Sequence, residues 1–316
     1  MTGIRSNESD AIGRLRVMML IRAFETALAK RRDHGFQLLS TGQEAVAAGL
    51  CAALRDDDQM LTGGRSIGLA LARGIDPRRL MAELLGKVDG PNRGKGGRGH
   101  LADPGAGFFG AHAVVGGNIS IAAGVALAKK LDRDGGIVAV VFGDGACGAG
   151  SLHETLNIAA IWKLPLLFVC DNNQLSVSTP RAEALAPKKL SDLGAAFGLS
   201  AQTVDGTDVE TVAQAAMALL EGVRRGDGPA FLECISHRFA AHSTTARELR
   251  DAAELARIRG TCPIVREATR LRAAGVIDAD LHDALEQDAL ADVSTAFAFA
   301  DASPYPDAGE ALSDVG

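Results

Sequence analysis

Residues 137–173 read IVAVVFGDGACGAGSLHETLNIAAIWKLPLLFVCDNN, and this stretch decides the fold. Its first residues, 137–142, form a short β-branched run bounded by glycines, which is typical of a buried strand. Residues 152–162 have a helical pattern, and residues 166–170 form a second apolar run that ends at Asp171. A strand, a helix and a strand in this order make a βαβ unit. The sequence therefore predicts a parallel sheet that is covered by helices on both faces.

Further elements extend this unit toward both ends of the chain. Asp76 and Pro77 are residue types favoured at the N-cap and the first position of a helix. Residues 116–130 have unusually small side chains, so we expect this helix to pack closely against another helix or a subunit. The predicted elements are helices over 12–33, 44–54, 77–85 and 116–130, a strand over 230–235, and charged helices from 248 onward. We predict a single α/β domain over 1–316, with a helical C-terminal extension and a flexible acidic tail at 303–316.

Composition excludes several classes of protein. The chain has 316 residues, of which 47% are hydrophobic and 23% charged, which does not fit a disordered chain. Its net charge of −6 gives no reason to expect binding to nucleic acid or to an anionic membrane surface. The five cysteines form no CxxC pair, which favours a reducing compartment. With no secretory signal and no apolar stretch that reads as a membrane span, we expect a cytoplasmic protein.

Polar side chains follow both strands of the βαβ unit. Asp144 comes directly after the first strand, and Asn172 and Asn173 follow the second. Because the carboxyl ends of parallel strands meet at the same edge of a sheet, we expect these side chains to lie close together. Carboxylate and amide oxygens suit a hard divalent cation that also takes phosphate oxygens, and the neighbouring glycines admit a diphosphate close to the backbone. These features favour a magnesium-diphosphate anchor.

The same residues allow two other interpretations. Gly143, Gly145 and Gly148 match the GxGxxG pattern of a dinucleotide site, with Asp171 where a ribose-binding acid would lie. Electrostatics disfavours this interpretation, because Asp144 would face the pyrophosphate anion directly unless a cation intervened. The remaining alternative is a glycine turn in which the Asp and Asn side chains only cap backbone groups.

Residues 143–180, GDGACGAGSLHETLNIAAIWKLPLLFVCDNNQLSVSTP, resemble the thiamin-diphosphate motif of the alpha subunits of 2-oxo acid dehydrogenases and acetoin dehydrogenases. Further segments resemble the same family in the same order: RLRVMMLIRAFE, TGQEAVAAGL, GKGG, AVVGGNISIAAGVALAKK, VDGTD and HRFAAHST. The resemblance implies a thiamin-diphosphate-binding fold with thiamin diphosphate and Mg²⁺ as cofactors. It also implies a beta subunit that supplies the pyrimidine half of the site, in a heterotetramer of two alpha and two beta chains.

The resemblance assigns the diphosphate and metal contacts residue by residue. Asp144 and Asn173 would bind the metal, together with the main-chain carbonyl of Leu175. Gly145 and Ala146 would approach the diphosphate.

The remaining assignments surround these contacts. Ala113 and Val115 would present backbone groups to the aminopyrimidine. Arg65 and Arg238 would pair with phosphate charge. His242 matches the active-site histidine of the family and would be a proton donor or acceptor near the reacting carbonyl.

Several positions depart from the family pattern. Leu38 and Ile67 stand where pyruvate- and acetoin-type members have histidine, and Gly64 stands where the family usually has tyrosine. The acidic run that follows the active-site histidine loop is replaced by residues 246–248, Ala-Arg-Glu. Losing both imidazoles would leave a drier pocket that suits a bulkier apolar substrate, and losing the tyrosine removes a hydroxyl that contacts phosphate.

The resemblance implies an alpha subunit that decarboxylates a 2-oxo acid or cleaves an acyloin. The acyl or aldehyde fragment would then pass to an acceptor, in most of the family a lipoyl group on an acyltransferase. One alternative is a carboligase that uses a small-molecule acceptor. Another is a non-catalytic regulatory subunit. The basic segment 91–100, PNRGKGGRGH, lacks a Walker pattern and is predicted to be a flexible loop near a subunit interface or the active-site entrance.

Overall fold

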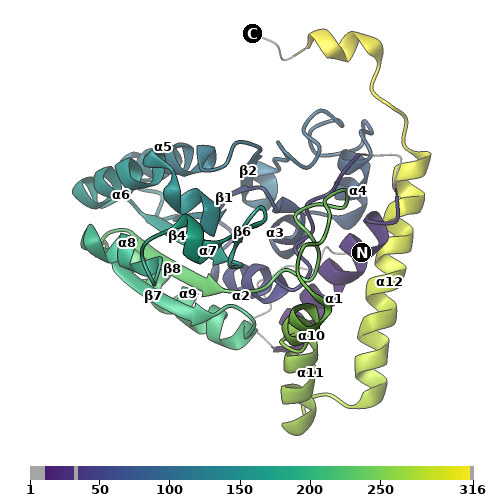
Figure 1. The fold of residues 1–316 in the computed structure, drawn as a ribbon. Coiled ribbons are helices and arrows are strands. Elements are labelled where there is room, and N and C mark those ends of the chain that lie inside the picture. Colours follow the sequence, from purple (N-terminus) through teal and green to yellow (C-terminus); the bar gives the residue numbers. More distant parts are fainter. Residues whose placement is uncertain (1–10, 32–34, 314–316) are drawn as a thin grey trace.

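The computed structural model describes residues 11–31 and 35–313. Its centre is a sheet of six parallel strands in the order β2-β1-β3-β4-β8-β7, which confirms the predicted fold class (Figure 1). The strands are β1 (Gln59–Gly63), β2 (Phe108–His112), β3 (Val138–Gly143), β4 (Leu166–Asn172), β7 (Ser200–Asp205) and β8 (Ala230–Ile235). A small antiparallel hairpin, β5 (Leu175–Ser176) and β6 (Thr179–Pro180), follows β4.

Helices cover both faces of the sheet. The helices α5, α6 and α8 lie on one face, and α2 and α9 lie on the other, where α1 and α12 pack behind them (Figure 1). The helices are α1 (Ala11–Leu28), α2 (Glu44–Ala53), α3 (Ser66–Ala72), α4 (Pro77–Leu84), α5 (Gly117–Asp132), α6 (Gly150–Trp162), α7 (Arg181–Ala184), α8 (Ser191–Ala196), α9 (Val209–Arg224), α10 (Ala252–Arg259), α11 (Pro263–Ala273) and α12 (Ala279–Ala302). Three short 3₁₀ helices are η1 (Pro104–Ala106), η2 (Asp144–Gly148) and η3 (Ala308–Leu312).

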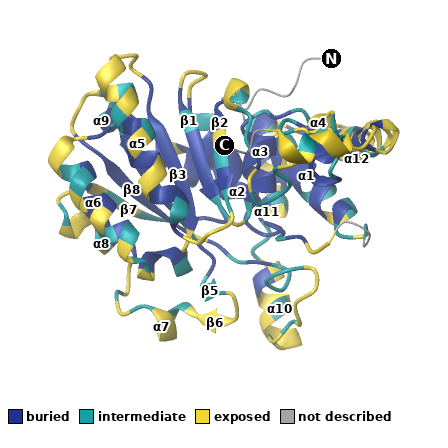
Figure 2. Cartoon of the chain, turned by 90° about the horizontal axis from the view of Figure 1, so that it is seen from above, coloured by how far each residue is buried: buried dark blue, intermediate teal, exposed yellow. Residues whose placement is uncertain are grey.

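The two apolar layers take alternate residues of each central strand. In β3, Val138, Val140 and Phe142 pack toward α5 and α6, whereas Ala139 and Val141 pack toward α2 and α9. All five side chains are buried, and β3 lies in the dark interior of Figure 2. This burial on both faces explains why the strand is continuously apolar instead of alternating.

Helix boundaries follow the apolar pattern closely, with one clear difference. The predicted helix over 12–33 ends at Leu28, where the buried stripe of α1 also ends, so further turns would bury nothing. Residues 32–34 lie outside the described residues. The predicted cap of α4 is confirmed, because Asp76 accepts a hydrogen bond from the backbone N–H of Arg78 at 2.9 Å and Pro77 occupies the first turn.

The basic loop 91–100, expected to be flexible, is organised around one buried carboxylate. Glu83 on α4 is 0% exposed and accepts four backbone N–H bonds, from Asn92, Gly94, Gly96 and Gly97. A fully buried carboxylate with this many donors fixes the path of the loop. The sequence pattern did not indicate it, because its partners are backbone groups.

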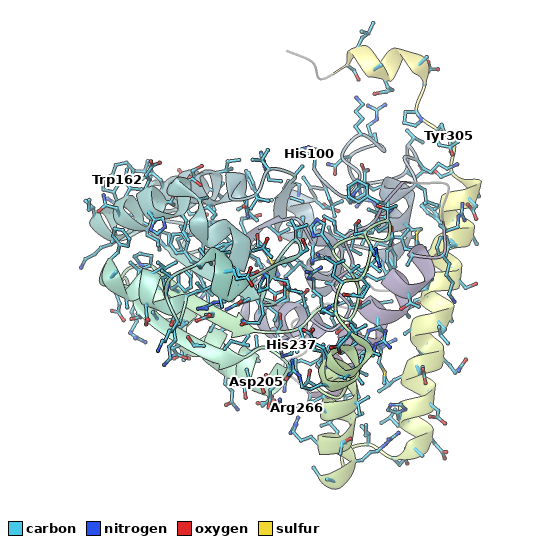
Figure 3. All side chains as sticks on the ribbon, viewed as in Figure 1. His100, Trp162, Asp205, His237, Arg266 and Tyr305 are labelled. Atoms are coloured by element: carbon cyan, nitrogen blue, oxygen red, sulfur yellow. The ribbon has the colours of Figure 1, made fainter. Side chains whose placement is uncertain are left out.

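The C-terminal segment lies against this loop. Lys87 donates to the main-chain carbonyl of Ser303 at 3.1 Å, and its ammonium lies 3.9 Å from the centre of the Tyr305 ring. Within and just after η3, Lys95 contacts Glu310 at 3.1 Å and Ser313 at 2.7 Å. Figure 3 shows Tyr305 and His100 at the same end of the molecule. The flexibility of this tail stays a prediction.

None of the described helices is long and apolar enough to cross a membrane.

Candidate functional site

A cavity of about 150 Å³ opens at the carboxyl edge of the sheet, beyond the ends of β1, β3 and β4. This is the edge where parallel sheets bind ligands. Most of the residues assigned from the sequence line it: Arg65, Val115, Asp144, Gly145, Ala146, Asn173, Leu175 and His242. Segments far apart in the chain are therefore brought to one place by the strand order.

Asp144 is the buried acid of the cavity. It follows β3 as the first residue of η2 and is 2% exposed. Its Oδ2 atom is buried and has no hydrogen-bond partner among the described residues. Burial raises the pKa of this carboxyl above its ordinary value, while backbone N–H groups of the loop and Arg238 act in the opposite direction. A buried carboxylate oxygen without a partner is costly unless a cation binds it.

Asn173 and Arg238 form a hydrogen-bonded pair in the proposed magnesium-diphosphate anchor. Nε of Arg238 donates to Oδ1 of Asn173 at 3.2 Å, and its Nη2 donates to the main-chain carbonyl of Val177 at 2.8 Å. The remaining nitrogen, Nη1, is buried and has no partner among the described residues. Arg238 is 2% exposed and lies behind Asn173, so it holds the amide in place and keeps one N–H group free.

The glycine that precedes Ala146 has no room for a side chain. A Cβ atom at Gly145 would lie 2.5 Å from Oγ of Ser176 in β5. The backbone of η2 is therefore held close to the hairpin, as a loop that receives a diphosphate requires.

These groups fit a magnesium ion and a diphosphate. The unpartnered oxygen of Asp144, the amide oxygen of Asn173 and the main-chain carbonyl of Leu175 are hard oxygen ligands of the kind Mg²⁺ prefers. The described residues contain no cluster of three or more His, Cys, Asp or Glu side chains that would hold a metal without such help. A metal here would therefore need phosphate oxygens to complete its coordination.

Arg65 joins two loops at the mouth of the cavity. Its Nη1 donates to the main-chain carbonyl of Leu39 at 2.6 Å, and its Nη2 donates to that of His242 at 2.9 Å. Burial and the charge of Arg238 lower the pKa of Arg65 to about 10, while Glu25 and the acids of the site act in the opposite direction. The side chain stays cationic at neutral pH.

His242 lies against this guanidinium. Burial and the charges of Arg65 and Arg238 lower the pKa of His242, so the imidazole is neutral at neutral pH. Nη2 of Arg65 lies 3.4 Å from Nδ1. Because a guanidinium only donates, Nδ1 is the acceptor and the ring proton resides on Nε2.

A hydrogen-bonded group in the lining of the cavity was not assigned to the magnesium-diphosphate site from the sequence. Asp171 accepts hydrogen bonds from the side chains of Gln43 and Ser236, the latter at 2.5 Å. Burial raises the pKa of Asp171 to about 6, despite these bonds. Asn172, paired with Asn173 in the sequence argument, points instead into the core and donates to Glu233 at 2.7 Å. Gln43 belongs to the family-like segment TGQEAVAAGL, but its partner is 128 positions away, so no local pattern indicates the contact.

The positions that depart from the family pattern have different surroundings. Leu38 lines the cavity, so its apolar side chain does replace an imidazole there. Gly64 also lines it, with φ of +65° and open space where a Cβ atom would lie. Ile67 is 1% exposed in the core on α3, so the expectation that it borders the pocket is wrong. Ala113 lies outside the lining of the cavity, whereas Val115 is part of it.

The fold and the site define the class of this protein. The sequence profile described as Dehydrogenase E1 component matches residues 14–309, and the chain belongs to that family. Membership implies thiamin diphosphate as the cofactor and confirms the predicted enzyme class.

Similar proteins cover nearly the whole chain. The alpha subunit of acetoin:2,6-dichlorophenolindophenol oxidoreductase from Bacillus subtilis (strain 168) is 35% identical, over 99% of this chain and 95% of its own. The pyruvate dehydrogenase E1 component subunit alpha of Zymomonas mobilis is 39% identical, over 95% of this chain and 86% of its own. The pyruvate dehydrogenase E1 component subunit alpha of Rhizobium meliloti (strain 1021) is 34% identical, over 98% of this chain and 90% of its own.

Proposed function

We propose that this chain is the alpha subunit of a thiamin-diphosphate-dependent enzyme that decarboxylates a 2-oxo acid or cleaves an acyloin. The fragment that remains passes to an acceptor, which we propose is a lipoyl group on an acyltransferase. The observation that carries the proposal is the buried, unpartnered oxygen of Asp144 beside a cavity that Asp144 and Asn173 both line. Arg238 lies outside this lining and contacts it through its hydrogen bond to Asn173.

The chain's own residues would hold the cofactor. Asp144, Asn173 and the carbonyl of Leu175 would bind Mg²⁺, and the Mg²⁺ would carry the diphosphate. Arg65 and Arg238 add positive charge around the same cavity. The chemistry that thiamin diphosphate supplies when bound is addition to a substrate carbonyl and acceptance of the electron pair left by the departing fragment.

His242 positions and transfers a proton at that carbonyl. Burial and the charge of Arg65 keep the ring neutral, and the contact with Arg65 fixes its proton on Nε2. His242 would therefore offer an N–H to a carbonyl oxygen in the cavity. A neutral donor of this kind stabilises developing negative charge on the oxygen without needing acidic pH.

A second chain would complete the site. Val114 and Val115 are 62% and 69% exposed beside the cavity, which is unusual for adjacent apolar residues. A beta subunit covering them would bury both and supply the pyrimidine half of the site. We propose a heterotetramer of two alpha and two beta chains.

The lining of the cavity also indicates which kind of substrate it would accept. Leu38, Leu69 and Val177 give its lining an apolar part, and Gly64 leaves space beside them. These residues favour a carbonyl substrate with a bulky apolar group. The same open lining favours, as a second candidate, a carboligase that passes the fragment to a small acceptor.

Calorimetric titration with thiamin diphosphate and Mg²⁺, with and without the beta chain, tests the proposal. Asp144→Ala should weaken metal-dependent binding about 100-fold, because a charged ligand contributes about 3 kcal/mol. The matched variant Asp280→Ala removes an exposed carboxylate on α12 and should bind as wild type does. Equal affinity of Asp144→Ala and wild type would overturn the proposed anchor. Fragment transfer to an isolated lipoyl domain then separates the two candidate reactions.

A further inference from the structure

Two adjoining cavities lie at the amino edge of the sheet, opposite the site described above. The first, of about 380 Å³, borders the residues that precede β3 and β4. Its lining contains five cationic side chains and no acidic one among the described residues: Lys129, Lys130, Arg133, Lys163 and Arg224. This concentration of positive charge is unexpected in a chain whose net charge is −6.

Two of the five cations are balanced by carboxylates. Arg224 forms an ion pair with the buried Asp58, and Lys129 pairs with Asp134 at 3.0 Å. Both also donate to main-chain carbonyls, so they stabilise this edge of the fold.

The other three cations have no carboxylate partner in the described part of the chain. Lys130 donates to the main-chain carbonyl of Trp162 at the end of α6. Neither Arg133 nor Lys163 makes a side-chain hydrogen bond or ion pair with any described residue. Three cations in the lining of the cavity therefore have no ion-pair partner among the described residues.

Helix dipoles do not account for this charge. The helices α5, α6 and α9 all end here, and each C-terminus carries about −0.5 charge. Their sum of about −1.5 offsets half of the three unpaired charges. The helix ends therefore offset only part of the positive charge of these three side chains.

Two of the cations also hold an unfavourable backbone conformation. Arg133 and Lys163 follow the ends of α5 and α6 with φ of 55° and 46°, in the left-handed region where glycine is normally found. A long cationic side chain stands at both positions despite this conformational cost.

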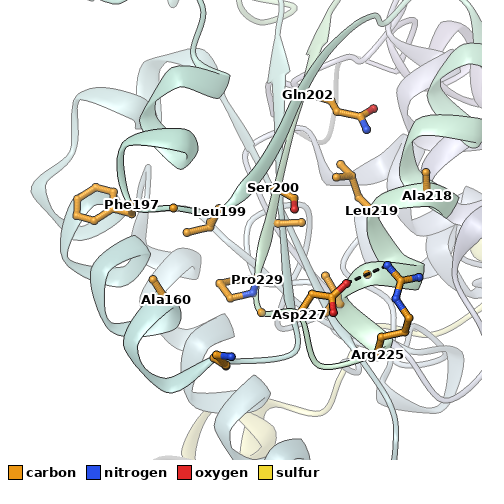
Figure 4. A pocket seen from close by; sticks show the side chains of 16 residues that line it. Ala160, Phe197, Leu199, Ser200, Gln202, Ala218, Leu219, Arg225, Asp227 and Pro229 are labelled. Carbon is orange, nitrogen blue, oxygen red and sulfur yellow. Dashed lines mark hydrogen bonds and ion pairs between the residues drawn. The ribbon is translucent and has the colours of Figure 1, made fainter.

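The second cavity, of about 350 Å³, adjoins the first, because Lys163 and Val223 line both. It is bordered by Phe197, Leu199 and Pro229, which Figure 4 shows together. Its Arg225 is already paired with Asp227 at 2.9 Å. The second cavity is thus less charged, and both volumes are in the range of small-molecule sites.

We propose that these two cavities form one binding site for an organic phosphate, separate from the thiamin-diphosphate site. The phosphates lie among Lys130, Arg133 and Lys163, and the less polar part of the ligand enters the cavity beside Phe197. ADP has both parts and is the probe we would use.

The test is calorimetric titration with ADP and Mg²⁺ of the full chain carrying Asp144→Ala, which disables the proposed cofactor anchor without adding a second organic diphosphate. The double variant Arg133→Gly and Lys163→Gly suits the left-handed backbone, so its thermal midpoint should equal or exceed that of wild type. ADP affinity should fall at least about 30-fold in this variant, because two charge-assisted contacts are lost. Arg272→Ala, which removes one exposed charge on α11, should change ADP affinity less than about twofold.

Pyrophosphate provides the second arm of the test. ADP binding about tenfold tighter than pyrophosphate binding would support use of the second cavity. Equal affinities would overturn the organic part of the proposal. Absence of ADP binding, or binding that the double variant leaves unchanged, would overturn the site itself, whatever the fate of the thiamin-diphosphate anchor.

Discussion

Nη2 of Arg65 lies 3.4 Å from Nδ1 of His242 and donates to the main-chain carbonyl of the same residue at 2.9 Å. One guanidinium group thus fixes both the backbone and the ring of the proposed catalytic histidine. Its charge contributes to the lowered pKa of His242, after burial, which has the larger effect. A neutral ring with its proton on Nε2 is the consequence.

Arg65→Met should raise the pKa of His242 toward its ordinary value of 6.5, because one repelling charge is removed. Below the wild-type pKa the ring is charged, so the acid limb of activity should move to higher pH in the variant. Titration of isotope-labelled histidine by NMR measures the change without activity. Arg65→Lys keeps the charge and should keep the low pKa. An unchanged pKa of His242 in Arg65→Met would show that the charge of Arg65 does not lower it.

Glu25 should make stability depend on pH. It is fully buried on α1 and accepts hydrogen bonds from the backbone and side chain of Ser40, yet burial raises its pKa from 4.5 to about 8. The folded protein therefore binds this proton more tightly than the unfolded chain does. The stabilisation is complete below pH 4.5 and is lost as the pH rises through about 8.

Glu25→Gln removes this titration. Between pH 5 and 8, the unfolding free energy of the variant should rise relative to that of wild type. Urea denaturation at several pH values across that range measures this difference. Other titrating groups cancel in the difference. Glu286→Gln changes an exposed glutamate on α12 and should give a difference that stays flat. A flat difference for Glu25→Gln as well would refute the raised pKa.

Glu83→Ala should release the basic loop. Four backbone N–H groups at distances of 2.8 to 2.9 Å lose a charged acceptor, and some become buried without a partner. Hydrogen bonds to charged groups contribute about 1.5 to 3 kcal/mol each, so a loss of at least about 3 kcal/mol in unfolding free energy is expected. Hydrogen exchange of the amides of residues 92–97 should accelerate together. Glu286→Ala serves as the surface control, and unchanged exchange in Glu83→Ala would contradict the role of this carboxylate.

The strands and helices that could be predicted are those that a local pattern of apolar residues and glycines marks in the sequence. The strands and the helix within residues 137–173 agree with the prediction to within two residues, because continuous apolar runs and their glycine boundaries are local signals. Asp144 and Asn173 were placed together because one crossover separates them. A single βαβ crossover brings the carboxyl ends of its two parallel strands to the same edge of the sheet.

Contacts that were missed join groups without a pattern in the chain. Arg65 and His242 are 177 positions apart, and their contact depends on how two loops pack. Glu83 binds backbone N–H groups, which nearly every residue type offers, so no side-chain motif marks its partners. Ile67 was expected in the pocket because a resemblance fixes the position in the chain but not the direction of the side chain.

Gly145→Ala should weaken binding of thiamin diphosphate and Mg²⁺ at least about tenfold, or about 1.4 kcal/mol. The added Cβ would lie 2.5 Å from Oγ of Ser176, so the loop or the hairpin must move, and both border the proposed anchor. Gly148→Ala is the matched control in the same 3₁₀ helix. Its Cβ would lie 3.6 Å from Cδ2 of Leu185, an ordinary contact, so affinity should stay within about twofold of wild type.

A second change separates crowding from general damage to the loop. Ser176→Gly removes the side chain that the new methyl group would meet, so Gly145→Ala combined with Ser176→Gly should recover most of the lost affinity in the same calorimetric titration. Recovery would show that close approach of the backbone at Gly145 is what the diphosphate anchor requires. If the double variant stays as weak as Gly145→Ala, or if Gly148→Ala is equally weak, the contact with Ser176 is not the cause.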